Sequence, residues 1–220
     1  MQTVIQIARS KISSALPLQR LKRLREHFDR CHYVRVPGIL EPRLLEYARR
    51  ELKDAPFFKV TYETVGTELC MRENTLDGMF LFLLNDPYLF DLAEKITGCG
   101  RIRSFVGRMY RFIPGEGHHD SWHEDTMESR VLAVSINLSP EIYQGGILQI
   151  RNKKTGKIVS RVVNTGFGDS IFFRLADSLE HRLSEVKGKV PKTAFAGWFS
   201  SKPVFSFHFE RKKRWPCEKA

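Results

Sequence analysis

The sequence predicts a mostly β fold with helices at its N-terminal end, and three observations support this prediction. The chain has 220 residues, which suffices for one sizeable domain with its own core. Hydrophobic residues make up 42% and charged residues 28% of the chain, which is typical of globular proteins. Near residue 101 the spacing of apolar residues changes from a helical period to short β-type runs.

The first hundred residues are predicted to be mostly helical. Apolar residues at helical spacing predict helices around residues 21–28 and 44–48, with a short strand at 33–36 between them. A third helical region covers about 76–96 and is interrupted by the Asn-Asp-Pro sequence at 85–87.

The remainder of the chain is predicted to be all β. Turn residues separate its β-branched and aromatic runs, and Lys153 to Gly156 predict a hairpin. Seven strands are expected, at 101–113, 131–138, 147–152, 157–164, 170–173, 183–186 and 194–200. Strands spaced so closely favour two facing sheets, as in a jelly roll or barrel, with helices against the outside.

We therefore expect one domain with three parts. Residues 1–100 form a helical support region packed on the core, residues 101–202 form the β core, and residues 203–220 form a basic tail. The cationic run at 210–214 is either an anion contact or, as is commoner for such runs, a solvated chain end.

Charge and cysteine usage restrict the partners and the compartment. There are 36 Lys and Arg against 25 Asp and Glu, and the net charge of +11 favours an anionic substrate or one on an anionic carrier. The four cysteines form no CxxC pair, so we expect reduced thiols. No segment approaches the ~20 apolar residues of a membrane span, so we expect a cytoplasmic protein with no membrane partner.

Three residues of the β half have the chemistry of metal ligands. His123 and Asp125 occur at i and i+2 just before a predicted strand, so they project from the same side of an extended backbone. His181 follows 58 residues later, between the run ending at Phe173 and the strand expected from 183. Two imidazoles and one carboxylate on one face of an octahedral ion are typical of non-haem Fe(II) sites.

A second HxD sequence competes with this one. His118 and Asp120 have the same spacing, but they follow the turn at 114–117 and are expected to lie in a loop. We prefer His123 because it leads directly into the strand. By itself HxD also arises by chance, and a lone histidine at a strand end is usually only hydrogen-bonded.

Further motifs between residues 105 and 199 occur in the order and approximate spacing of a known enzyme family. They are Tyr110, Pro114-Gly115, Trp122 to Asp125, Arg130-Val131, Asn137-Leu138, Gly145-Gly146, Gly168-Asp169, His181 and Lys192 to Trp198. In these motifs the chain resembles the Fe(II)- and 2-oxoglutarate-dependent dioxygenases, in particular the branch of the prolyl 4-hydroxylases. The resemblance implies a double-stranded β-helix core (jelly roll, cupin-like) as the catalytic part.

The resemblance also implies the site residues and the cofactors. It makes His123, Asp125 and His181 the catalytic iron ligands, with 2-oxoglutarate and O2 as co-substrates and ascorbate as a further candidate cofactor. Lys192 occupies the place of the basic residue for the distal carboxylate of 2-oxoglutarate, which needs a cation when it is desolvated. Tyr110, Thr193 and Arg130 are further candidates for contacts with that co-substrate, Arg130 alternatively with the substrate.

The implied activity is hydroxylation of an unactivated C–H bond, with succinate and CO2 as co-products. The expected substrate is a peptide, an amino acid or a related natural product. Alternatives are a nucleic-acid or protein demethylase of the same superfamily, with nucleic acid the less favoured partner, and a non-catalytic cupin-like binding protein.

Overall fold

The computed structural model describes residues 5–126 and 129–203. Residues 204–220 of the predicted basic tail, including its cationic run, lie outside the described residues.

Four helices are present in the described part of the chain. They are α1 (Leu18–Cys31), α2 (Pro42–Lys53), α3 (Thr75–Leu84) and α4 (Pro87–Thr97). The Asn74 side chain accepts hydrogen bonds from the backbone N–H groups of Leu76 and Asp77, and so caps α3. Asp86 caps α4, which begins at Pro87. The break predicted at 85–87 is therefore confirmed.

The β strands form two larger sheets. The larger has the order β3-β12-β8-β15-β6-β5-β4, with β7 paired to β5, and the smaller has the order β11-β10-β13. The bounds of the larger sheet's strands are β3 (Tyr33–Val36), β4 (Phe57–Tyr62), β5 (Gly66–Met71), β6 (Ser104–Phe112), β7 (His119–Asp120), β8 (Arg130–Asn137), β12 (Ser170–Arg174) and β15 (Lys192–Ser200). The smaller sheet consists of β10 (Leu148–Asn152), β11 (Ile158–Val162) and β13 (Leu179–Leu183). Two further pairs are β1 (Ile5–Ile7) with β2 (Ile12–Ser14), and β9 (Gln144–Gly145) with β14 (Val186–Lys187).

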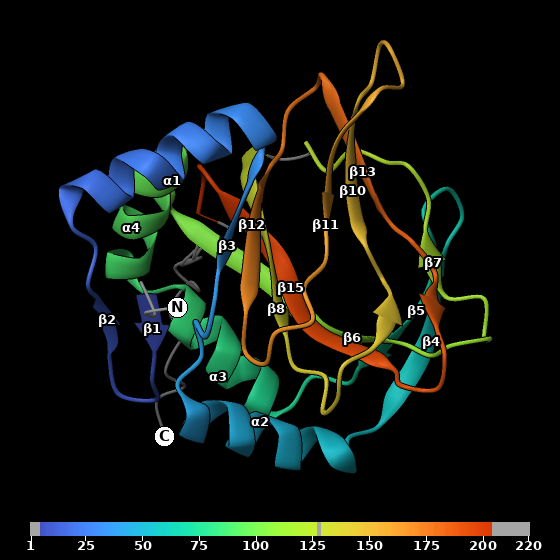
Figure 1. Cartoon of the computed structure of the whole chain (residues 1–220). Helices are drawn as coiled ribbons and strands as arrows, with labels where there is room; N and C mark the ends of the chain where they lie inside the picture. The colour runs from blue at the N-terminus through green and yellow to red at the C-terminus, as the bar shows by residue number, and fades with distance from the viewer. Residues whose placement is uncertain (1–4, 127–128, 204–220) are drawn as a thin grey trace, which may run out of the picture.

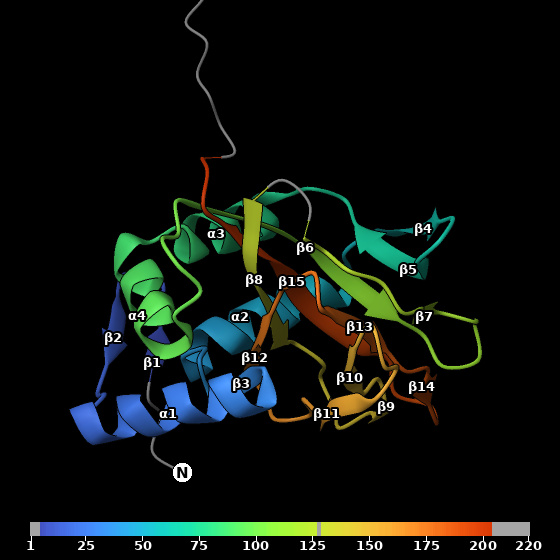
Figure 2. The same ribbon diagram turned by 90° about the horizontal axis from the view of Figure 1, so that it is seen from above.

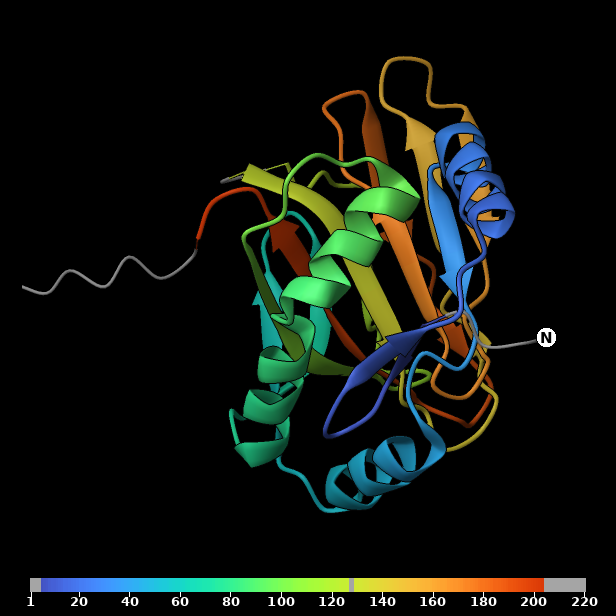
Figure 3. The same ribbon diagram turned by 90° about the vertical axis from the view of Figure 1, so that its left-hand side faces the viewer.

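The helices and the smaller sheet lie on opposite sides of the larger sheet. α3 and α4 cross one face of it (Figure 3), and β10, β11 and β13 gather on the side away from them (Figure 2). One apolar core lies between the larger sheet and the helices, and a second joins Leu148 and Val162 of the smaller sheet to Ile171 and Phe173 of the larger one. Two facing sheets with helices outside confirm the predicted fold class.

The central strand β15 shows how the sequence separates these two sides. Phe195 and Phe199 are fully buried against the helices and contact Phe80, Phe90 and Phe105. Because side chains alternate along a strand, Lys192, Ala196 and Trp198 point to the other side, between the sheets.

Two expectations about strands were wrong. The strand expected at 183–186 is divided between the end of β13 and the start of β14, because Leu179 to Leu183 pair with Asn152 to Leu148 of β10. His181 therefore lies in the middle of a strand rather than before one. The segment 118–120, expected as loop, contains β7, which pairs with Gly66 and Thr67 of β5.

In the described part of the chain, no helix is both long enough and apolar enough to cross a membrane.

Candidate active site

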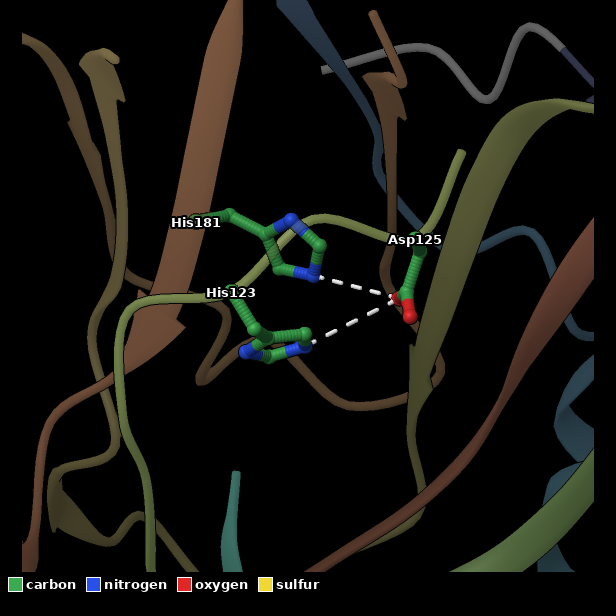
Figure 4. Close-up of side chains that lie close together, drawn as sticks. All are labelled: His123, Asp125 and His181. Atoms are coloured by element: carbon green, nitrogen blue, oxygen red, sulfur yellow. Dashed lines mark ion pairs between the residues drawn. The ribbon is translucent and has the colours of Figure 1, made fainter. Parts of the chain in front are cut away.

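The structure brings His123, Asp125 and His181 together at one point between the sheets (Figure 4). His123 and His181 face each other across an antiparallel bridge, in which the backbone N–H of each donates to the carbonyl of the other, at 3.0 and 2.9 Å. The Nε2 atoms of His181 and His123 lie 3.3 and 3.8 Å from Oδ2 of Asp125. One possible ligand atom from each residue lies within 4.8 Å of the others, so the three can hold one ion.

The charges of this group suit a cation. Burial alone raises the pKa of Asp125, but the hydrogen bond and charge of His181, the charge of His123 and the bond from Trp198 outweigh it and lower the pKa to about 2. Burial lowers the pKa of His181. At neutral pH the carboxylate is therefore ionised and the His181 imidazole neutral, the forms that bind metal.

Neighbouring groups orient these side chains. Nδ1 of His123 donates to the Ser121 carbonyl at 2.8 Å, which leaves Nε2 for the centre. The indole N–H of Trp198 donates to Oδ2 of Asp125 at 2.7 Å. The Arg130 guanidinium lies 3.9 Å from the Trp198 ring centroid and 3.6 Å from Oδ1 of Asp125. The side chains of Trp198 and Arg130, both from the larger sheet, therefore hold the Asp125 carboxylate in place.

We predict that Trp198→Phe weakens metal binding about tenfold, because it removes the N–H donor to Asp125 and keeps an aromatic ring beside Arg130. Calorimetric titration of the protein with Fe(II) under anaerobic conditions measures the effect. Trp122→Phe is the matched control, since the Trp122 ring contacts the guanidinium groups of Arg151 and Arg182 and does not line the cavity. Equal affinities of the wild type and Trp198→Phe would contradict this role.

A cavity of about 380 Å³ extends from these three residues between the two sheets. Apolar side chains of both sheets form much of its wall, among them Leu148, Val162, Ile171 and Phe173. Such a chamber, with apolar walls into which polar and charged groups converge, is typical of a small-molecule site.

Lys192 and Tyr110 are the predicted co-substrate residues that lie inside this cavity and are buried. Lys192 is 3% exposed, and its Nζ lies 3.4 Å from the Gly146 carbonyl oxygen and 5.5 Å from the Tyr110 ring centroid. Burial lowers the pKa of Lys192 to about 8. Tyr110 is 4% exposed, and its hydroxyl has no hydrogen-bond partner among the described residues. A buried cation and a buried free hydroxyl side by side form a site for an anionic group.

The other predicted residues have different surroundings. Arg130 lines the cavity beside Asp125. Thr193 lies outside the cavity lining, because it follows Lys192 in β15 and faces the opposite side, where its hydroxyl accepts a hydrogen bond from Nε of Arg111 at 3.1 Å. The structure therefore does not bring Thr193 to the site.

In the competing HxD sequence, the side chains of His118 and Asp120 lie in different surroundings. Nδ1 of His118 accepts a hydrogen bond from the Ile113 backbone N–H at 2.9 Å and thereby closes the turn at 114–117. His119 is exposed, and neither histidine lines the cavity, whereas Asp120 does. Within residues 5–126 and 129–203, the one group of His, Cys, Asp and Glu side chains arranged for a metal is His123, Asp125 and His181.

Sequence reasoning assigned no role to several polar residues that line the cavity, among them Glu68, Arg108 and Trp198. Asp120 also lines it, although it was considered only as part of the competing HxD sequence. The period-2 pattern of residues 66–71 and 104–112 would show which side chains share a face, but not that these strands border the site.

Comparison with known proteins shows a family match over the second half of the chain. Residues 107–200, which include His123, Asp125, His181 and Lys192, match the family described as the 2OG-Fe(II) oxygenase superfamily. No curated protein was found to match the sequence.

Solved structures with the same fold are numerous. A 2OG-Fe(II) oxygenase family oxidoreductase from Burkholderia pseudomallei is 15% identical, with a TM-score of 0.63 over 83% of this chain and 91% of the other. A prolyl hydroxylase from Trichoplax adhaerens, in complex with a peptide of hypoxia inducible factor, is 13% identical, with a TM-score of 0.61 over 84% of this chain and 92% of the other. The epimerase SnoN, in complex with Fe3+, alpha ketoglutarate and nogalamycin RO, is 18% identical, with a TM-score of 0.58 over 84% of each chain.

These identities support the fold, while the family match covers most of the strands that surround the cavity. The matched family takes its name from 2-oxoglutarate and Fe(II), and the SnoN structure contains Fe3+ and alpha ketoglutarate. Over residues 107–200 the chain is therefore similar to the 2OG-Fe(II) oxygenase superfamily, and its fold is that of solved oxidoreductases of this family.

Proposed function

We propose that the protein is an Fe(II)- and 2-oxoglutarate-dependent dioxygenase that hydroxylates an unactivated C–H bond of a peptide, an amino acid or a related natural product, and forms succinate and CO2. One observation carries the proposal, namely that the His-Asp-His group and the buried Lys192 open into the same cavity.

The donor set fits Fe(II). His123, Asp125 and His181 would hold the metal through two imidazole nitrogens and one carboxylate oxygen. Three protein ligands on one face leave positions free for a co-substrate and O2, whereas a closed structural zinc site needs a fourth protein ligand, usually Cys. Of the described cysteines, Cys31, Cys70 and Cys99, none lines the cavity.

The deep end of the cavity fits the distal carboxylate of 2-oxoglutarate. Lys192 has no ion-pair partner among the described residues and would donate to this carboxylate, together with the free hydroxyl of Tyr110. Burial raises the pKa of Tyr110, so its hydroxyl stays protonated and able to donate. A charge-assisted bond of this kind would satisfy two buried polar groups at once.

The chain's own residues position the reactants and exclude water. Bound iron with 2-oxoglutarate and O2 supplies the oxidising equivalent for the C–H bond. Trp198 and Arg130 hold the Asp125 carboxylate, and Lys192 would fix the far end of 2-oxoglutarate. The apolar wall keeps solvent from the reacting carbon.

Binding of 2-oxoglutarate should weaken with rising pH. The free site has a Lys192 pKa of about 8, and bound carboxylate favours the ammonium form. Below pH 8 the ammonium is present before binding, whereas above it a proton must be taken up, so the Kd should rise up to about tenfold per pH unit. Lys192→Arg should flatten this profile, since arginine stays charged. Calorimetric Kd values from pH 6.5 to about 9.5 test this, and an unchanged Kd in the wild type would contradict it.

The substrate class is tested by a screen. Prolyl and other peptides, free amino acids and small natural products are incubated with Fe(II), 2-oxoglutarate and ascorbate, and products are analysed by mass spectrometry. A gain of one oxygen matched by an equal amount of succinate, and absent in His123→Ala, supports the proposal. Succinate coupled to loss of a methyl group as formaldehyde would replace hydroxylation with demethylation.

A further inference from the structure

The wall of the cavity contains two acidic side chains that the proposed chemistry does not use. Gly66 of β5 lies directly opposite Asp120 of β7, so their side-chain positions share one face of the sheet. Glu68, two residues beyond Gly66, lies on that same face, and both carboxylates line the cavity.

The backbones of β5 and β7 approach closely at this point. A Cβ on Gly66 would lie 1.8 Å from the His119 carbonyl oxygen, so the strands can pair this way only with glycine there. This contact fixes the position of Asp120 on the cavity wall.

Glu68 has protein partners. Its Oε1 accepts hydrogen bonds from Nε of Arg108 at 2.8 Å and from Sγ of Cys70 at 3.3 Å. The Arg108 guanidinium lies 5.5 Å from the ring centroids of both Tyr62 and Trp198. Glu68 and Arg108 therefore form an ion pair whose charges balance each other.

Asp120 has no such partner. Among the described residues it makes neither a hydrogen bond nor an ion pair, although it interacts with the charges of His123, Lys192 and Arg108. Arg108 is paired with Glu68, and Lys192 is assigned to 2-oxoglutarate. Burial, followed by the charge of Glu68, raises the pKa of Asp120 to about 6, so at neutral pH the group is mostly an ionised carboxylate without a partner.

Two further groups of the cavity wall are suited to a ligand. The Tyr110 hydroxyl is buried in the same cavity without a partner, and the charge of Asp120 contributes to its raised pKa. Tyr62 lines the cavity and is 38% exposed, so this side of the wall is open to solvent and its ring is accessible. A carboxylate and an accessible aromatic ring that line the same cavity can together recognise an organic cation.

We propose that Asp120, with Tyr62 in the same cavity wall, forms a subsite for a positively charged group of the substrate, an amine or a guanidinium. The inference rests on the proposed function, because the subsite would direct the substrate's reacting carbon to the iron. It replaces the expectation of an anionic substrate, which was based on net charge alone.

A pair of probes that differ in the presence of the terminal ammonium group tests this subsite. Nα-acetyl-lysine methylamide and the neutral Nα-acetyl-norleucine methylamide are titrated calorimetrically into the protein loaded with Fe(II) and 2-oxoglutarate without O2. The wild type should bind the lysine probe at least about tenfold more tightly, as expected for one charge-assisted hydrogen bond. Asp120→Asn should reduce this preference to less than about twofold.

The control variant removes one acidic group from the same hairpin. Glu63 is exposed in the β4–β5 turn and does not line the cavity, so Glu63→Gln should keep the full preference. Equal affinity for the two probes in the wild type, including no measurable binding of either, would overturn the inference. So would a preference that survives in Asp120→Asn.

The two proposals fail in different ways. If the wild type forms no visible charge-transfer band with Fe(II) and 2-oxoglutarate, the proposed function fails. If the band forms and the lysine probe has no advantage, the subsite alone is refuted.

Discussion

Replacing His181 with alanine is expected to abolish succinate formation, and the same result is expected for His123→Ala and Asp125→Ala. Each change removes one of three ligand atoms that lie within 4.8 Å of one another, and two ligands do not retain the metal at a useful concentration. Succinate is measured by chromatography after incubation with Fe(II), 2-oxoglutarate and ascorbate in air.

His119→Ala is the control for this series, because His119 belongs to the competing HxD segment and is exposed outside the cavity. It should keep wild-type turnover. Circular dichroism establishes that each variant is folded. Turnover that persists in all three ligand variants would refute the assignment of the metal site.

Replacing Lys192 with alanine is expected to raise the Kd of 2-oxoglutarate by about 100-fold or more. The variant leaves a carboxylate in a buried site without its cation, and loss of one partner of a buried pair costs about 3–5 kcal/mol. Binding is measured by titrating 2-oxoglutarate into the protein with Fe(II) without O2. The Kd of Fe(II) itself should change little, since Lys192 is not among the proposed ligands.

Lys187→Ala provides the comparison. Lys187 and Lys189 flank the turn at Gly188 and are exposed, so neither is expected to contact the co-substrate. A normal Kd in Lys192→Ala together with a raised Kd in Lys187→Ala, Lys189→Ala or Arg130→Ala would transfer the role to that residue.

The sequence predicted those elements of the fold that local patterns determine. α3 and α4 were recognised because the Asn-Asp-Pro sequence contains a helix stop and an N-cap. The strand that the sequence placed at 183–186 lies at 179–183 as β13. It was placed too late because the charged residues Glu180 and Arg182 alternate with the inward-facing residues and interrupt the apolar pattern. These two side chains bind Arg151 and Gln149 of β10, and only the pairing of the strands reveals this.

The same distinction between local and long-range information holds for the site. HxD is a local spacing, so His123 and Asp125 could be proposed directly. His181 was added from its position before the next expected strand, and the family resemblance led to Lys192. The contact of Trp198 with Asp125 joins residues 73 positions apart, and that of Glu68 with Arg108 joins residues 40 apart. Thr193 was grouped with Lys192 because the two are neighbours in sequence, although alternation along β15 separates their side chains.

The most direct test of the central claim is an anaerobic titration of Fe(II) into the protein saturated with 2-oxoglutarate, followed by visible absorption. We predict a charge-transfer band that saturates at one Fe(II) per chain in the wild type and is missing from His123→Ala and His181→Ala. No band in the wild type, or an undiminished band in both variants, would contradict the proposal that these histidines hold the iron to which 2-oxoglutarate binds.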